Sequence, residues 1–287
     1  MTESMHGEPE RLGLKIGVTL GSIGVDAAWW LESARRLEDA GYDGVWCWDH
    51  FVGRGDRTVP VLEQWTTLAA AAAVTSRIGL GTHVTNVMNR HPAVLARTAS
   101  TVQAISSGRL TLGIGIGGHP AEHRAYGIDF PSPGERAARM EEAIAVIRAL
   151  WTGGPVTLPG PYYPLEDAVA HPAPSPRPRI LVGASSITGV RLAARAADGW
   201  IPDARDFDRL VGPYRDALAE VGRSVKDVHI VVGFGSGRSG QDALTDSPWI
   251  TSRAETAARW AAEGADEVAI TARTTADVNR LVAAAAR

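Results

Sequence analysis

Short apolar stretches alternate with amphipathic stretches along almost the whole chain. Brief runs rich in valine, isoleucine and leucine are typical of buried parallel strands, and each run is followed by a stretch with helical periodicity. Helices are predicted to begin near residues 26, 62, 92, 132, 188, 208, 252 and 276. Strands are predicted at residues 14–20, 42–50, 77–84, 109–115, 179–183, 199–201, 229–234 and 267–270. Eight strands, each followed by a helix, predict an α/β protein with the (β/α)8 TIM barrel fold.

Residues that start and stop helices lie at the predicted boundaries. Asp26 is placed to cap the first helix and Gly41 to end it. Pro92 suits the first turn of the third helix. Capping boxes stand at Ser132-Pro133-Gly134-Glu135 and at Ser252-x-x-Glu255. These signals support the element boundaries independently of the apolar pattern.

Residues 153–178 form the most irregular part of the chain. Prolines occupy positions 155, 159, 161, 164, 172, 174, 176 and 178. Loops this long are uncommon in compact domains, and those that occur are usually functional or act as lids. Strand–helix alternation resumes at Arg179. We therefore interpret the segment as a proline-rich insertion between strands four and five, and residues 1–287 as one domain.

The composition fits a globular protein and excludes several other classes. Of the 287 residues, 45% are hydrophobic, and a net charge of -3 provides no basic field for nucleic acid or an anionic membrane. No apolar run is long enough to span a bilayer, and residues 1–11 lack the apolar core of a signal peptide. Cys47 is the only cysteine, which we interpret as a small buried side chain. We therefore predict a cytoplasmic protein that binds neither nucleic acid nor membranes.

The run from Arg109 to His123 passes from apolar residues to glycines and then to histidines, and it fits three different structures. Gly113, Gly115 and Gly118 match the G-x-G-x-x-G fingerprint, which places backbone amides against a pyrophosphate. That fingerprint requires a helix directly after it and an acidic residue at the end of the next strand. Neither follows here, so we discount a dinucleotide-binding fold.

The end of the same run matches a zinc motif. His119, Glu122 and His123 satisfy H-x-x-E-H, which can hold a zinc ion on one face of a helix. Pro120 suits the start of such a helix, but Gly127 and Pro131 limit it to about two turns. We predict no metal site here and interpret the two histidines as solvated loop residues.

The third interpretation makes the run a barrel strand that ends at the mouth. Gly115, Gly117 and Gly118 then lie at the carboxyl ends of the strands, where a flat ligand needs close approach to the backbone. Active sites of this fold lie on that face, so the residues at the other strand ends become candidates. They are Asp49 and His50, residues 83–86, residues 183–186, and Asp203 with Arg205.

Two of these groups point to particular chemistry. His50 beside a carboxylate suits proton transfer near neutral pH, and a purely structural pairing of Asp49 is an equal alternative. Residues 183–189 combine small residues with hydroxyls, which favours an anion site at a helix N-terminus, although an ordinary turn needs the same residues. Trp46 and Trp48 can line a pocket, and core packing is the expected use of at least one of them.

Five segments carry a family resemblance through their order and spacing. They are Gly44-Val-Trp-Cys-Trp-Asp-His50, Gly79-Leu-Gly-Thr-His-Val-Thr85, Arg90-His-Pro92, Ser107-Gly-Arg-Leu-Thr-Leu-Gly-Ile-Gly115 and Ala197-Asp-Gly-Trp-Ile-Pro202. Together they resemble the bacterial luciferase-like superfamily, most closely its branch that uses the deazaflavin coenzyme F420. The resemblance extends from Leu14 to the last predicted helix.

The resemblance implies that the coenzyme's ring lies across the barrel mouth, against a bulge that often contains a non-prolyl cis peptide. The matching peptide here is His83-Val84. It also implies that Asp49 touches the polar edge of the ring, that Gly117 lies under the ring, and that His50 stands near the hydride-transferring carbon. The remaining residues of the implied cofactor site are Gly115, Gly118, Gly183, Ala184, Ser185 and Ser186, the last four as the phosphate-binding loop.

The chain departs from the F420-dependent sugar-phosphate dehydrogenases at two positions. Those enzymes carry a glutamate at the place of Gly118 and, if no gap intervenes, a tryptophan at the place of Arg54. Lysine occurs only at Lys15 and Lys226, so basic residues suited to a sugar phosphate are not recognisable. These differences argue against that activity.

The sequence predicts an F420-dependent oxidoreductase that moves a hydride between the deazaflavin and a small organic substrate, with His50 as proton donor or orienting group. An FMN-dependent monooxygenase that uses reduced flavin and oxygen is the alternative within the fold, and a non-catalytic ligand-binding barrel is an alternative of another class. A zinc hydrolase is a more distant one. The resemblance further implies a homodimer. We expect residues 153–178 and the loops after strands seven and eight to select the substrate.

Overall fold

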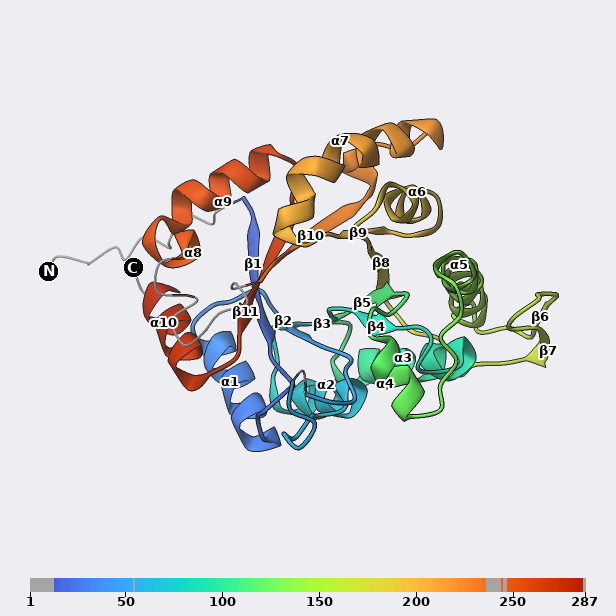
Figure 1. Cartoon of the computed structure of the whole chain (residues 1–287), viewed down its shortest axis with the longest axis horizontal. Coiled ribbons are helices and arrows are strands. Elements are labelled where there is room, and N and C mark those ends of the chain that lie inside the picture. The colour runs from blue at the N-terminus through green and yellow to red at the C-terminus, as the bar shows by residue number, and fades with distance from the viewer. Residues whose placement is uncertain (1–12, 54, 236–243, 245–246, 286–287) are drawn as a thin grey trace, which may run out of the picture.

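The structure, a computed structural model, describes residues 13–53, 55–235, 244 and 247–285. Within these residues, eight parallel strands close into a barrel. The ring runs β1, β2, β3, β5, β8, β9, β10 and β11, and β11 pairs with β1 to close it (Figure 1). The strands are β1 Lys15–Leu20, β2 Gly44–Cys47, β3 Gly79–Thr82, β5 Leu110–Gly115, β8 Arg179–Gly183, β9 Gly199–Ile201, β10 His229–Phe234 and β11 Glu267–Ala272. The predicted (β/α)8 TIM barrel is confirmed.

Eight longer helices cover the outside of the barrel within the described residues. They are α1 Ala27–Asp39, α2 Gln64–Val74, α3 Pro92–Ile105, α5 Pro133–Leu150, α6 Ile187–Ala196, α7 Ala204–Glu220, α9 Arg253–Ala262 and α10 Thr275–Ala285. Shorter elements are α4 Pro120–Ala125, α8 Pro248–Thr251 and the 3-10 helix Val225–Asp227. No helix among the described residues has the length and apolar character needed to cross a membrane.

The predicted helix starts are confirmed where a side chain caps the first turn. Asp26 accepts a hydrogen bond from the backbone N–H of Trp29 at 2.7 Å, and Ser132 accepts one from Glu135. Ser252 makes no side-chain cap hydrogen bond, so the second capping box is wrong. The helix predicted to begin near residue 208 begins at residue 204, because Asp203 caps it earlier. Short-range polar patterns thus locate a helix to within about a turn, but they do not fix which residue caps it.

Three aspartates at the beginnings of strands make the same pair of hydrogen bonds to the neighbouring strand. Asp43, Asp198 and Asp266 each precede a strand, and each accepts a hydrogen bond at 2.8 Å from an isoleucine N–H of the neighbouring strand. The backbone N–H of each aspartate donates to the carbonyl of the same isoleucine. At the end of a parallel ladder such N–H groups would otherwise lack a partner, which is costly when they are buried. The aspartates therefore fix where three pairs of strands begin.

The inside of the barrel is filled by Trp46 and four smaller apolar side chains. They are Leu181, Ile201, Val231 and Ala269, with Val84 packed against them. The indole N–H of Trp46 donates to the Glu267 carboxylate at 2.8 Å, which satisfies it within the barrel. Trp46 thus takes the expected core position, whereas Trp48 is half-buried and stacks beneath the Arg273 guanidinium at 5.2 Å. The filled interior confines any ligand to the two open ends.

The proline-rich insertion lies away from the barrel mouth. It contains an antiparallel hairpin, β6 Val156–Leu158 and β7 Leu165–Ala168, which projects at the edge of the molecule beside α5 (Figure 1). The segment joins a helix to the next strand, so it belongs to the face where strands start, whereas active sites of this fold lie where strands end. None of residues 153–178 lines the described mouth cavity. The expectation that this segment acts as a lid or selects the substrate therefore finds no support.

Three predictions concern residues outside the described ranges. They are the polar start at residues 1–11, the departure at Arg54, and most of the loop after the seventh strand. The eighth strand is followed by a loop of only two residues, Arg273 and Thr274, before α10 begins.

Candidate active site

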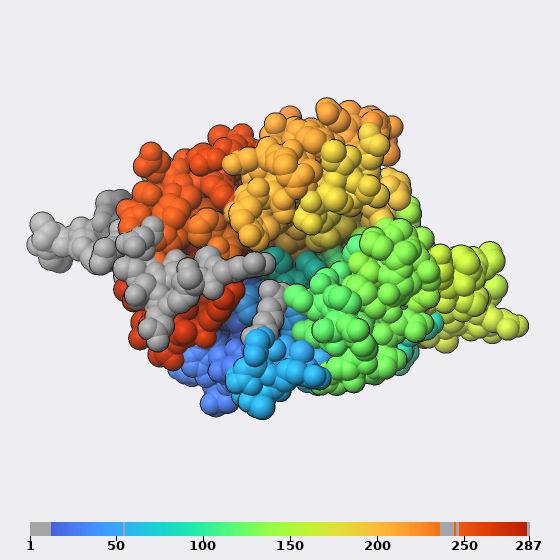
Figure 2. Space-filling model, viewed as in Figure 1, coloured from blue at the N-terminus to red at the C-terminus, as the bar shows by residue number. Residues whose placement is uncertain are grey.

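A cavity of about 300 Å³ opens at the carboxyl ends of the strands. The surface is visibly hollowed near the middle of this face, between the green segment that follows β5 and the orange helix α7 (Figure 2). The lining residues are Asp49, His50, His83, Val84, Asn86, Gly115, Ile116, Gly117, Gly118, His119, Glu122, His123, Gly183 and Ser185. The volume is at the lower end of the range for small-molecule sites.

Most of the residues predicted for the site line this one cavity, although they come from four separate strand ends. The predicted residues that do not line it are Thr85, Ala184, Ser186, Asp203 and Arg205. The Ala184 carbonyl accepts a hydrogen bond from the Trp200 indole at 3.0 Å, and the Ser186 hydroxyl caps α6 by accepting one from Gly189. The shared cavity follows from barrel closure, which brings together strand ends that are far apart in sequence.

The third strand is interrupted at the predicted position. The His83-Val84 peptide is cis, and it separates β3 from the two-residue strand β4, Thr85–Asn86. Val84 lies between two glycines, because a Cβ on Gly115 would come within 2.7 Å of its side chain and one on Gly183 within 3.0 Å. The predicted bulge is therefore present, and these two glycines make room for it.

His83 lies beneath the bulge as a neutral side chain. Burial lowers the pKa of His83 to about 4, an effect that the Asp203 carboxylate opposes only partly. Its Nδ1 lies 2.8 Å from the hydroxyl of Thr19, and the Trp46 ring meets it edge-on at 6.3 Å between centroids. At neutral pH this imidazole is therefore uncharged, with one ring nitrogen as a hydrogen-bond donor and the other as an acceptor.

Asp49 is buried in a network of donors, with 2% of its side chain exposed. Arg90 binds it through two guanidinium nitrogens, at 2.6 and 3.0 Å, and the Asn86 backbone N–H donates to it at 2.8 Å. The sequence left two roles open for Asp49, a structural pairing and a contact with the cofactor. The structure contains the structural pairing. Arg90 was missed as a site residue, although it stands in the Arg90-His-Pro92 segment that carried part of the resemblance.

His50 pairs with a carboxylate that the sequence had associated with zinc. Its Nδ1 lies 3.1 Å and 3.3 Å from the two oxygens of Glu122, a residue of α4 that is 6% exposed. The ring of His119, the residue before α4, stands 5.1 Å from that of His50. Glu122 is thus a site residue for which the sequence gave the signal but suggested another chemistry.

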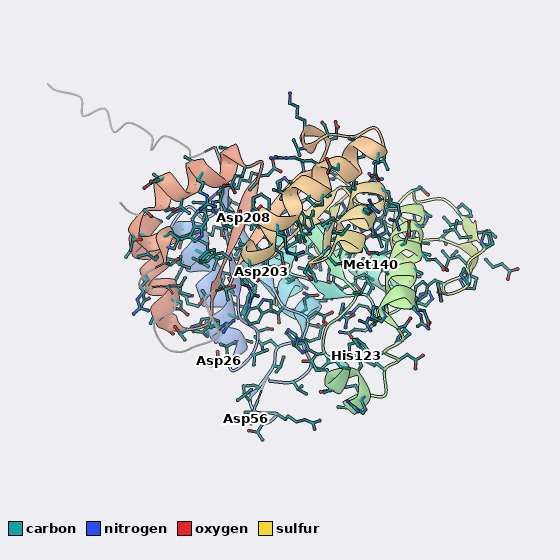
Figure 3. All side chains as sticks on the ribbon, turned by 45° about the horizontal axis from the view of Figure 1, so that its top comes forward. Asp26, Asp56, His123, Met140, Asp203 and Asp208 are labelled. Carbon is teal, nitrogen blue, oxygen red and sulfur yellow. The ribbon has the colours of Figure 1, made fainter. Side chains whose placement is uncertain are left out.

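The prediction that His123 is a solvated loop residue is wrong. The side chain is 1% exposed, its Nε2 accepts a hydrogen bond from the Asn86 amide at 2.9 Å, and its Nδ1 donates to the His119 carbonyl at 3.0 Å. His123 lies on α4, and Asp203 lies apart from it before the start of α7 (Figure 3). Among the described residues no group of three potential ligands is placed to hold a metal ion.

Gly117 and Gly118 differ sharply in their surroundings. Gly117 has a φ of +74°, and a Cβ there would meet the Asn86 side chain at 2.8 Å. Gly118 has no atom within 4 Å of the position that a Cβ would occupy. Gly117 is therefore required by the backbone and by Asn86, whereas Gly118 leaves open space in the cavity.

The loop after β8 combines small residues with a nearby cation. Ser185 lines the cavity, Ser186 caps α6, and the Arg209 guanidinium donates to the Ser185 carbonyl at 3.1 Å. Arg209 comes from α7, and no local sequence signal marked it. A helix N-terminus next to an arginine is a favourable setting for an anion.

Similarity to known proteins agrees with this geometry. The sequence profile of the family described as luciferase-like monooxygenase matches residues 15–287. The chain belongs to the luciferase-like monooxygenase family. Within this family it is 37% identical over 199 residues to the F420-dependent glucose-6-phosphate dehydrogenase of Kineococcus radiotolerans, covering 68% of this chain and 57% of that one. It is 33% identical over 218 residues to the F420-dependent hydroxymycolic acid dehydrogenase of Mycobacterium tuberculosis, covering 75% and 60%.

Solved structures share the luciferase-like barrel over nearly the full chain. An F420-dependent secondary alcohol dehydrogenase in complex with an F420-acetone adduct superposes with a TM-score of 0.80, at 18% identity, covering 96% of this chain and 99% of that one. The monooxygenase RslO1 from Streptomyces bottropensis gives 0.71 at 25% identity, covering 94% and 97%. The first of these likenesses shows the fold alone. The matches to the two curated relatives span less than two thirds of each relative's own length.

Proposed function

We propose that this protein is an F420-dependent oxidoreductase that transfers a hydride between the deazaflavin and a small organic alcohol or carbonyl compound. The observation that carries the proposal is the mouth cavity, which places the His83-Val84 bulge, four glycines and the His50–Glu122 pair around one space. The similarity to F420-dependent dehydrogenases over two thirds of the chain or more supports the choice of cofactor.

The residues of the cavity fit a deazaflavin. Gly117 and Gly118 present backbone without side chains to the cavity, so a flat ring can lie against them. Ser185 and the α6 N-terminus provide donors for a phosphate, and Arg209, which pairs with Asp206 at 2.6 Å, lies beside them. An FMN molecule has the same two requirements, which is why it remains the alternative.

When bound, coenzyme F420 supplies the hydride chemistry. The protein's part is to hold the reactants together and to manage one proton. His50 lines the cavity and has a carboxylate behind it, so it can take the proton from an alcohol or return it to a carbonyl oxygen. Asp49 is held by Arg90 and Asn86, so it shapes the mouth through them.

The cavity disfavours a sugar phosphate as substrate. Both lysines lie at the opposite end of the barrel, where Lys15 starts β1 and Lys226 precedes β10. Gly118 provides space where the F420-dependent sugar-phosphate dehydrogenases are expected to carry an acid. We therefore propose a small, uncharged substrate, selected by residues 48–53, 55–63 and 116–132, which belong to the longer described connections at the mouth.

Titration with cofactors tests the proposal. Purified protein is titrated with F420, FMN and NADPH while cofactor fluorescence is followed, and zinc is assayed in the same sample. We expect saturable binding of F420 and turnover with a panel of secondary alcohols. Tight FMN binding without any response to F420 would replace the proposal by the monooxygenase, which the 25% identity to RslO1 favours as second candidate. Stoichiometric zinc would revive the hydrolase.

We also propose that the protein is a cytoplasmic homodimer, as the resemblance implies. The single cysteine supports a reducing compartment. Light scattering after size-exclusion chromatography measures the mass, which we expect to be twice 30.4 kDa.

A further inference from the structure

The H-x-x-E-H motif docks a short helix onto the barrel mouth. Its last two residues, Glu122 and His123, are both buried in α4, at 6% and 1% exposure. Each contacts the end of a different strand, because Glu122 faces His50 after β2 and His123 faces Asn86 in β4. Residues that resemble a metal site in sequence therefore connect α4 to two strand ends.

The His123 side of this connection is fixed by complementary hydrogen bonds. The Asn86 amide donates to Nε2 of His123, and the Asn86 backbone N–H donates to Asp49, which Arg90 holds from the other side. The side-chain oxygen Oδ1 of Asn86 accepts a hydrogen bond from the backbone N–H of Met88 at 3.0 Å. The ring of Phe130 packs against His123 at 4.4 Å. Each polar group thus has a defined direction, so α4 has little freedom to shift.

The Glu122 side determines which nitrogen of His50 carries hydrogen. An ionised carboxylate only accepts hydrogen bonds, and both oxygens of Glu122 lie within 3.3 Å of Nδ1. The side chains are 16% and 8% exposed, so water does not compete strongly for this contact. Nδ1 is therefore the protonated nitrogen, and in the neutral ring Nε2 is the acceptor.

We propose that Glu122 is a positioning residue that holds His50 in the Nδ1–H tautomer, with Nε2 as the nitrogen that accepts and returns the substrate proton. The inference about the tautomer stands on the geometry alone, and its catalytic consequence rests on the proposed function. When His50 takes a proton at Nε2, the imidazolium lies next to the Glu122 carboxylate, which stabilises it. His123 and Asn86 act one step further back, by fixing the helix that carries Glu122.

Two substitutions of Glu122 separate positioning from folding. Glu122→Gln keeps an oxygen that accepts from Nδ1, whereas Glu122→Leu fills the same space without an acceptor. Glu38→Gln is the control, since Glu38 is also a buried carboxylate but binds backbone N–H groups near residue 76, away from the cavity. Ring nitrogen chemical shifts from protein with 15N-labelled histidine report the tautomer, and His50→Gln assigns the His50 signals.

We expect the Nδ1–H tautomer in the wild type, in Glu122→Gln and in the control, and a shift toward Nε2–H in Glu122→Leu. For a substrate found in the cofactor assay, kcat should fall roughly 10- to 100-fold in Glu122→Leu, less than the full contribution of about 10²- to 10⁴-fold from general acid–base catalysis, because His50 itself is still present. It should fall less in Glu122→Gln, while KM and the Kd for F420 change less than about twofold in both variants.

The outcomes distinguish this inference from the proposed function. An Nε2–H tautomer in the wild type, or a tautomer and kcat unchanged in Glu122→Leu, overturns the positioning role. The expected tautomers together with no response to F420 leave the positioning of His50 standing and overturn the F420 activity instead. Because the tautomer is observed without cofactor, neither result depends on the other.

Discussion

At the scale of single residues, two adjacent glycines allow a matched test of the mouth geometry. Gly117 has a φ of +74°, and a Cβ there would press on Asn86, whereas a Cβ on Gly118 would meet nothing within 4 Å. We expect Gly117→Ala to lower the free energy of unfolding by about 1–3 kcal/mol, because it combines backbone strain with displacement of a buried amide. Gly118→Ala should stay within about 0.5 kcal/mol of the wild type. Urea denaturation measures both.

The Asn86 contacts give this prediction a second readout. Asn86 binds both Asp49 and His123, so Gly117→Ala should also change the ring nitrogen chemical shifts of His123. Equal effects of the two substitutions on the free energy of unfolding would contradict the prediction that a side chain is strained at Gly117 and free of contacts at Gly118.

At the scale of elements, the aspartates that precede strands fix where neighbouring strands begin to pair. Asp266 accepts from the N–H of Ile230 and donates its own N–H to the Ile230 carbonyl. Asp266→Ala leaves a buried N–H without its partner, so we expect a loss of about 1–3 kcal/mol in the free energy of unfolding. Thermal and urea denaturation check this value.

An exposed aspartate serves as the control for that substitution. The Asp208 side chain is 68% exposed and pairs loosely with Arg259 at 3.7 Å, so Asp208→Ala should change stability by no more than about 0.5 kcal/mol. If both variants lost the same small free energy of unfolding, the Asp266–Ile230 hydrogen bonds would contribute little more than an ordinary surface charge.

At the scale of the whole molecule, we propose that barrel closure joins the first and last strands into one folding unit. The first strand, β1, pairs with the last, β11, over six residues from Lys15–Glu267 to Leu20–Ala272. No strand pair can then open without breaking the ring, so we expect a single cooperative unfolding transition. Far-UV circular dichroism and fluorescence of the nine tryptophans should give the same midpoint. Two separated transitions would contradict the single-domain prediction.

Much of the fold follows from the sequence because strand and helix patterns are local. The strands at residues 179–183, 199–201 and 229–234 have the predicted bounds, and the barrel follows from strict alternation. The short helices α4 and α8 were not predicted as elements of the barrel, because one or two turns carry too few periodic positions to stand out. The place of the proline-rich segment could have been predicted, since a connection from helix to strand lies on the face opposite the mouth.

By itself the sequence determined the barrel and the glycines at its mouth, because these depend on periodicity and on small residues at strand ends. The position of the His83-Val84 bulge came from the family resemblance of the sequence. Only the tertiary structure decided the partners of the polar side chains. Asp49 binds Arg90, His50 binds Glu122 and His123 binds Asn86, pairs that lie 37 to 72 residues apart. Barrel closure creates those contacts, and no spacing along the chain encodes them. The run from Arg109 to His123 therefore contains a docked helix with a buried carboxylate, where its sequence alone fitted both a nucleotide fingerprint and a zinc motif.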